Sequence, residues 1–136
     1  MQRPQGLTPH LTVADAAGAS AFYAKAFGAK ELMRAPAADG KRLLHVSMQI
    51  GSSMLFMHDD FPDMCGGKSM TPASLGGTPV VIHQDVPDVD AAFKRAVDAG
   101  ATPRMAPEDQ FWGDRYAQVV DPYGHVWSLA APSKKE

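Results

Sequence analysis

"HLTVADAAGASAFYAKAFGA" (residues 10–29) and "HQDVPDVDAAFKRAVDAGA" (residues 83–101) follow one plan, and this repetition decides the fold. Each stretch begins with a histidine, has an aspartate five residues later, and ends in Gly-Ala. Similarity between two distant parts of one chain indicates a duplicated structural unit. We therefore expect two copies of one small module.

The residues before the first repeated aspartate alternate in character, which is typical of a strand with one buried face. One face carries the apolar side chains Leu7, Leu11 and Val13, and the other carries Thr8, His10 and Thr12. The corresponding polar-side positions in the second copy are Val81, His83 and Asp85.

A helix is expected after each of these strands. Asp15 and Asp88 precede the helical patterns, where a carboxylate can accept hydrogen bonds from the free amide groups of the first turn. Apolar residues then recur every three or four positions, which predicts one buried stripe per helix. Gly28 and Gly100 suit the left-handed residue that commonly follows a helix.

Three strand-like runs follow each helix, so the pattern is βαβββ, twice. In the first copy the runs are 30–35, 42–50 and 53–58, and in the second they are 102–106, 115–120 and 125–130. We expect one α+β domain over residues 1–136, with module one at 5–58, a Gly- and Pro-rich linker at 59–77 and module two at 78–131. A helix covers only one face of each sheet, so we expect paired curved mixed sheets around a cup-shaped cleft.

The overall composition excludes several classes of partner. A net charge of −2 without a basic stripe gives no electrostatic reason to bind nucleic acid. No apolar run approaches the roughly 20 residues that would span a membrane. The first ten residues lack the apolar core of a signal peptide, and the single cysteine, Cys65, fits a reducing compartment. We therefore expect a cytoplasmic protein.

Two motifs in the second copy carry a family resemblance: "FWGDRY" (111–116), followed by "DPYGHVW" (121–127). With the repeated stretches, they make the chain resemble the vicinal oxygen chelate superfamily, which includes glyoxalase I, extradiol dioxygenases and bleomycin-resistance proteins, and within it the PhnB-like branch. The resemblance covers nearly the whole chain. It implies a cleft for a small molecule and a homodimer.

The resemblance also bears on metal binding. Metal-using members hold one divalent ion with side chains from the first and last strands of each module, at positions that correspond here to Thr8, Leu55, Val81 and Ser128. None of the four is a histidine or a carboxylate, which are the ligands such an ion needs. We therefore expect no metal and no cofactor.

The expected ligand site is the cleft wall, formed by Thr8, His10, Phe56, Val81, His83, Trp112, Tyr116 and Ser128. The first interpretation is a protein that binds or sequesters a small, partly apolar metabolite or antibiotic. The second is a glyoxalase-type lyase, isomerase or dioxygenase with a relocated metal, or with His10 and His83 as an acid–base pair. A third is a structural or regulatory dimer whose cleft is filled by Met48, Met54 and Met57.

Several other residues allow specific expectations. Trp127 alternates with Ser128 and should point into the core. We expect the side chains of His58 and of the acidic residues Asp59, Asp60 and Asp63 to lie in solvent. We expect His125 to be exposed or to face a partner subunit. Trp112 is either a lid or stacking surface beside the cleft, or packed on the second sheet or on a partner subunit. Arg115 either binds an anionic ligand or pairs with Asp114 or Asp121.

Overall fold

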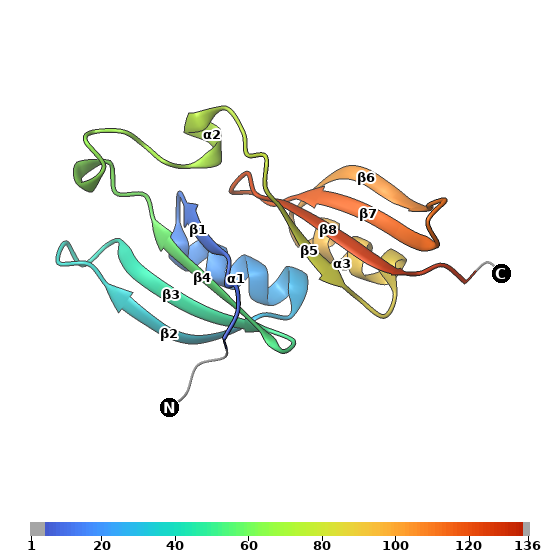
Figure 1. Ribbon diagram of the computed structural model, residues 1–136. Helices are drawn as coiled ribbons and strands as arrows, with labels where there is room; N and C mark the ends of the chain where they lie inside the picture. Colours follow the sequence, from blue (N-terminus) through green and yellow to red (C-terminus); the bar gives the residue numbers. More distant parts are fainter. Residues whose placement is uncertain (1–4, 135–136) are drawn as a thin grey trace.

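The computed structural model describes residues 5–134, which form two βαβββ modules (Figure 1). Module one contains β1 (His10–Val13), α1 (Ala16–Phe27), β2 (Lys30–Pro36), β3 (Leu43–Ile50) and β4 (Ser53–Asp59). The linker contains η1 (Pro62–Met64) and α2 (Pro72–Leu75). Module two contains β5 (Val81–Asp85), α3 (Val89–Ala99), β6 (Thr102–Asp109), β7 (Asp114–Val120) and β8 (Val126–Pro132).

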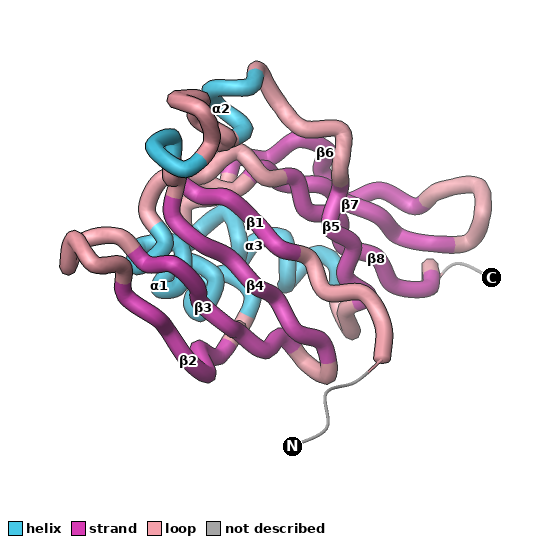
Figure 2. The backbone as a smooth tube through the Cα atoms, turned by 60° about the vertical axis from the view of Figure 1, so that its left-hand side comes forward, coloured by secondary structure: helices cyan, strands magenta, loops and turns pink. Residues whose placement is uncertain are grey.

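Each module has a mixed four-stranded sheet, so the predicted α+β class is confirmed. The strand orders are β1-β4-β3-β2 and β5-β8-β7-β6, and the first strand pairs in parallel with the last in both. Within residues 5–134, the two sheets do not join into a closed barrel. Helices α1 and α3 pack against each other behind the sheets (Figure 2), which leaves the opposite face of each sheet open.

The helix boundaries follow from the capping residues that the sequence indicates. Asp15 accepts a hydrogen bond from the Gly18 amide at 3.0 Å, and Asp88 accepts one from the Ala91 amide at 3.1 Å. Gly28 ends α1 with φ +70°, in the left-handed region. Leu7 was expected to be buried, but it is fully exposed, because β1 begins only at His10.

One hydrophobic core joins the two modules. It combines side chains of α1, among them Phe22 and Tyr23, with Val119 and Trp127 from module two. Trp127 is 1% exposed, which confirms its predicted place in the core. Met48 and Met57 are also fully buried in this core, so they do not fill a cleft on the open faces.

A buried carboxylate, Asp121, strengthens the contact between the modules. Its Oδ2 accepts hydrogen bonds from the Tyr23 hydroxyl at 2.5 Å and from Trp127 Nε1 at 2.9 Å. Its Oδ1 accepts from the amides of Tyr123 at 2.8 Å and His125 at 3.0 Å. Burial, reinforced by the Asp121 carboxylate, raises the pKa of the Tyr23 phenol well above 10.0. Asp121 therefore links α1 of module one to β8 of module two.

His125 adds a second link, which corrects its expected exposure to solvent or a partner. Its Nε2 lies 2.9 Å from the Thr12 carbonyl oxygen on β1. Strand β1 lies at the edge of its sheet and is not paired with β5. The His125 side chain therefore takes the place of a neighbouring strand as the partner of the Thr12 carbonyl group.

The three acidic residues expected in a solvated loop instead organise the linker. Asp59 is buried and accepts hydrogen bonds from the amides of Ala16 and Leu43 at 2.8 and 2.6 Å. Asp60 accepts one from the Ser69 hydroxyl, and Asp63 forms an ion pair with Arg42 at 2.8 Å. Asp59 and Asp63 thus tie the linker to module one, and Asp60 bonds within the linker itself.

Candidate functional site

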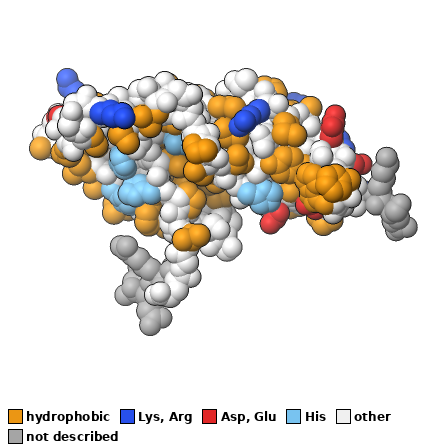
Figure 3. Space-filling model, turned by 45° about the horizontal axis from the view of Figure 1, so that its top comes forward, with side chains coloured by type: hydrophobic (Ala, Val, Ile, Leu, Met, Phe, Trp, Pro, Cys, Tyr) orange, Lys and Arg blue, Asp and Glu red, His pale blue; other side chains and the backbone are white. Residues whose placement is uncertain are grey.

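The two open sheet faces carry the side chains that can meet a ligand. Strand register aligns His10 with Phe56 in module one and His83 with Ser128 in module two. In the space-filling view, histidine side chains gather over module one, and another lies over module two on the same side of the molecule (Figure 3).

The face of module one contains a cluster of three histidines and one phenylalanine. The His10 ring lies 5.1 Å from that of His58, 5.7 Å from that of His45 and 5.9 Å from that of Phe56, edge to face in each case. Burial, with the neighbouring His58 and His45, lowers the pKa of His10 below 6.5. The His10 imidazole is therefore neutral near neutral pH.

The histidines of this cluster differ in what holds them. His58 lies between the Thr12 hydroxyl at 3.5 Å and the Asp59 carbonyl oxygen at 2.7 Å, so it is not the solvated residue expected from the sequence. His45 contacts the Ser47 hydroxyl at 2.9 Å. Within residues 5–134, His10 makes only ring contacts, so its nitrogens are free to bond a ligand.

The face of module two is arranged around His83, which is held on both sides. Its Nδ1 lies 2.8 Å from the Ser128 hydroxyl and its Nε2 lies 3.0 Å from the Asp85 carboxylate. Tyr116 stacks beside it, with ring centroids 6.5 Å apart, and the Gln118 amide donates to the Tyr116 hydroxyl. Because Ser128 is 1% exposed, its hydroxyl is not presented to a substrate.

His10 and His83, although equivalent in the repeat, therefore differ chemically. Both ring nitrogens of His83 are engaged, whereas those of His10 are free for a ligand. The structure does not present them as a matched acid–base pair: each belongs to a separate cluster on its own sheet.

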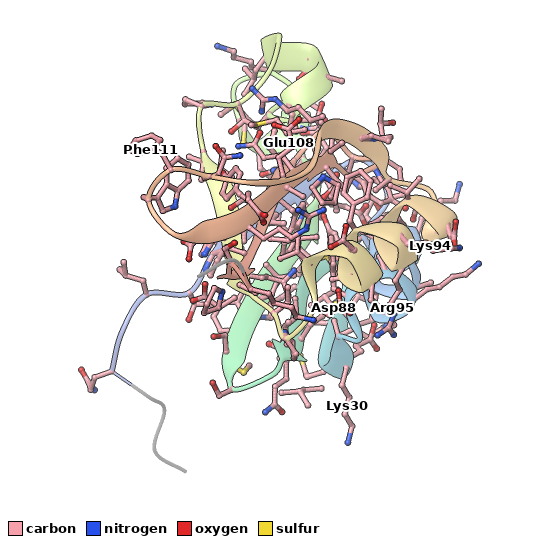
Figure 4. The ribbon with its side chains drawn as sticks, turned by 90° about the vertical axis from the view of Figure 1, so that its right-hand side faces the viewer. Lys30, Asp88, Lys94, Arg95, Glu108 and Phe111 are labelled. Carbon is pink, nitrogen blue, oxygen red and sulfur yellow. The ribbon has the colours of Figure 1, made fainter. Side chains whose placement is uncertain are left out.

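The hairpin between β6 and β7 extends the aromatic surface of module two. Phe111 is 98% exposed and projects from this hairpin, away from the body of the protein (Figure 4). Trp112 is half exposed; its Nε1 donates to Asp114 at 3.1 Å, and its ring lies 6.1 Å from that of Tyr116. Trp112 thus packs beside Tyr116 and still presents part of its ring to solvent.

The structure revises one of the positions that correspond to metal ligands. Leu55 is 2% exposed and belongs to the core, on the helix side of β4. Register makes Phe56 the equivalent of Ser128, since these residues lie opposite His10 and His83 respectively. Among residues 5–134, no three His, Cys, Asp or Glu side chains are placed to hold a metal ion.

The remaining expected wall residues fall at the strand entrances. Thr8 precedes β1 and is exposed, and Val81 begins β5 with 38% exposure. Arg115 forms ion pairs with Asp90 at 2.7 Å and Asp109 at 3.2 Å, rather than with Asp114 or Asp121. Asp90 and Asp109 occupy the guanidinium, so Arg115 has a structural role.

Sequence reasoning did not include His45 and His58 among the expected wall residues, although both lie on the open face with His10. The alternation of side chains along β3 and β4 could have predicted that both histidines lie on the open face. His45 lies two residues before Ser47 on β3, and His58 lies two residues after Phe56 on β4. Register then brings these residues beside His10.

The sequence profile of the Glyoxalase/Bleomycin resistance protein/Dioxygenase superfamily matches residues 7–129. The chain belongs to this superfamily. An uncharacterised protein of Mycobacterium bovis is 59% identical over 129 residues, which are 95% of this chain and 84% of that protein.

Two solved structures of this glyoxalase superfamily fold show the same architecture. The crystal structure of TioX from Micromonospora sp. ML1 is 27% identical, with a TM-score of 0.72, over 96% of this chain and 100% of that one. The bleomycin-binding protein in complex with bleomycin is 22% identical, with a TM-score of 0.66, over the same shares. At that identity the second structure shows only a shared fold.

Within the described residues, no helix is long and apolar enough to cross a membrane.

Proposed function

We propose that this glyoxalase-superfamily protein binds a small, partly apolar organic molecule on its open sheet faces, as a homodimer and without a resident metal. The observation that carries the proposal is the make-up of these faces. Phe56, Tyr116 and Trp112 offer aromatic surface, and His10 offers unpartnered ring nitrogens beside it. Apolar area with a few placed polar groups is typical of small-molecule sites.

The positions equivalent to metal ligands support binding without an ion. In this chain they are Thr8, Phe56, Val81 and Ser128, once the register is taken into account. A divalent ion in such a site needs several imidazole or carboxylate donors. Hydroxyls, an aromatic ring and an alkyl group do not supply them.

The ligand class follows from the surface and is supported by the fold. The bleomycin-binding protein, which shares the fold, holds bleomycin in its structure. A partly apolar metabolite or antibiotic suits the aromatic faces of this chain. Free Cys65 favours a reducing, cytoplasmic location for this binding.

A homodimer would cover apolar side chains that the single chain leaves in solvent. Phe111 is 98% and Met33 51% exposed. Large exposed apolar side chains commonly mark interaction surfaces. Light scattering should give twice the chain mass of 14.5 kDa, and a monomer at micromolar concentration would contradict the dimer.

Ligand binding can be tested by calorimetric titration with bleomycin, accompanied by metal analysis of untagged protein. We expect saturable binding that weakens about tenfold in Phe56→Ala and Trp112→Ala, because each change removes a large aromatic contact. Leu75→Ala, on the linker helix away from both faces, is the matched control. Stoichiometric metal, or binding that neither aromatic change affects, would overturn the proposal.

The free ring nitrogens of His10 favour one second candidate, a glyoxalase-type lyase, isomerase or dioxygenase. Because its pKa lies below 6.5, His10 would remain a competent base into mildly acidic solution. Turnover of the methylglyoxal–glutathione hemithioacetal, lost in His10→Gln and retained in His83→Gln, would select this activity. No turnover with the wild-type protein would exclude that substrate.

A further inference from the structure

A groove on the helix side of the protein lies apart from the open sheet faces. It has a volume of about 360 Å³ and runs between the end of α1 and the start of α3. Asp88 and Arg95, which are labelled in Figure 4, are among its lining residues. The volume lies within the usual range of about 300–1,000 Å³ for small-molecule sites. The groove is therefore large enough to hold a small ligand.

The walls of this groove are mostly apolar. Phe27 borders it from α1, Val86 from the segment after β5, and Leu129 from β8. Ala91 and Ala92 border it from α3, and their short side chains leave space between the two helices. Walls of this kind favour an apolar ligand, because binding removes apolar surface from water.

Arg95 brings a positive charge to the groove in a fixed position. Its Nε donates a hydrogen bond to the Lys25 carbonyl oxygen, near the end of α1, at 2.9 Å. This bond holds the guanidinium group between the helices. The Arg95 side chain is nevertheless exposed, so a ligand in the groove can reach it.

The outer nitrogens of Arg95 are free to bind an anion. Within residues 5–134, Nη1 and Nη2 have no hydrogen-bond or ion-pair partner. Arg34, Arg42 and Arg115, by contrast, each pair with a carboxylate of the protein. A guanidinium group presents its N–H donors as a planar fork, which matches the two oxygens of a carboxylate. The free donors of Arg95 therefore favour a carboxylate from a ligand.

Asp88 restricts how such a ligand can lie. Its Oδ1 accepts a hydrogen bond from the Ala91 amide at the start of α3. It precedes Arg95 by seven residues, which corresponds to about 10 Å along a helix. Repulsion by Asp88 directs a ligand carboxylate to the Arg95 end. Among the described residues that line the groove, Arg95 is the only cation, so it offers one position for one carboxylate.

We propose that this groove binds a small apolar monocarboxylate, of the size of a medium-chain fatty acid. The carboxylate pairs with Nη1 and Nη2 of Arg95, and the chain lies against Phe27, Val86 and Leu129. The inference does not rest on the proposed function, because none of its arguments uses the open sheet faces.

The test compares octanoate with 1-octanol, which has the same chain length and no charge. Each is titrated into ¹⁵N-labelled protein while chemical shifts are followed by NMR. We expect octanoate to bind saturably, to shift the amides of Phe27, Ala91 and Ala92, and to bind about fivefold more tightly than 1-octanol. Added salt should narrow this difference, because it screens the ion pair.

Substitution of Arg95 separates the charge from the apolar walls. Arg95→Gln should weaken octanoate about fivefold and leave 1-octanol unchanged, because only the ion pair is lost. Arg104→Gln, the same change at an exposed arginine outside the groove, is the matched control and should bind both probes as the wild type does.

Arg95→Gln also removes the bond to Lys25, so Ala91→Leu provides an independent test of the groove. Leucine is a good helix former, and its larger side chain fills the space, so both probes should weaken while the melting temperature is kept. Equal octanoate affinity in wild type and Arg95→Gln, unchanged binding in Ala91→Leu, shifts confined to the open faces, or no saturable binding would each overturn the site. Bleomycin titration of Arg95→Gln should match the wild type, which keeps this result separate from the proposed function.

Discussion

Replacing Asp121 by Asn should separate the electrostatic contribution of the module junction from its packing. The carboxylate is 3% exposed and accepts four hydrogen bonds, two at each oxygen. An asparagine of the same shape keeps one oxygen and presents an NH₂ group to two donors. Hydrogen bonds to a charged group contribute roughly 1.5–3 kcal/mol each, so losing two should cost about 3–6 kcal/mol.

Urea unfolding followed by circular dichroism measures this cost. A slope of about 1–3 kcal/mol per molar urea converts the loss into a midpoint lower by roughly 2 M. Tyr23→Phe removes one of the four donors. It should cost much less when combined with Asp121→Asn than in the wild type, because the two groups are in contact.

Tyr123→Phe provides the matched control. This phenol makes no hydrogen bond through its hydroxyl within residues 5–134, so its removal should change the free energy of unfolding by less than about 0.5 kcal/mol. A loss below about 1 kcal/mol in Asp121→Asn would refute the assigned role, because it would mean that the four contacts contribute no more than exposed ones.

Three further predictions follow from the same geometry. Because the pKa of Tyr23 is raised in the folded protein, its contribution to stability should be complete below about pH 10 and decline above it, and Tyr23→Phe should flatten that decline in urea unfolding at about pH 9–11.5. NMR titration should place the pKa of His10 below 6.5, and His58→Gln should raise it part of the way back; an unchanged value would remove His58 as a cause. Gly28→Ala should destabilise the protein by about 1–2 kcal/mol in thermal unfolding, because φ is +70° there. Gly6→Ala, which has nothing near its added Cβ, should leave the stability unchanged in the same measurement.

The sequence predicted the repeated architecture well because its signals are local. A capping aspartate, a helix-ending glycine and a period of two are each properties of neighbouring residues, and Asp15, Gly28 and β3 were found from them. The start of β1, by contrast, depends on its pairing with the distant strand β4. Leu7 continues the alternation, but it has no strand beside it to bury it, so pattern alone extended the strand too far.

The candidate site was harder to predict because it depends on register and on contacts across the chain. A shift of one residue along a strand moves every side chain to the other face of the sheet. The family resemblance placed Leu55 at the cleft position, but the strand register puts Phe56 there and Leu55 in the core. The different environments of His10 and His83 could not be read from the repeat, since Ser128 contacts His83 and the equivalent position beside His10 is Phe56.

The parallel pairing of the first and last strands in each module has a consequence for synthesis on the ribosome. All backbone ladders close within a module, so residues 10–59 can complete their sheet before β5 has been translated. The apolar face of α1, however, must wait for Trp127 and Asp121 near the carboxyl end. The nascent protein thus passes through a half-built stage with an uncovered helix, when chaperones would be expected to engage it.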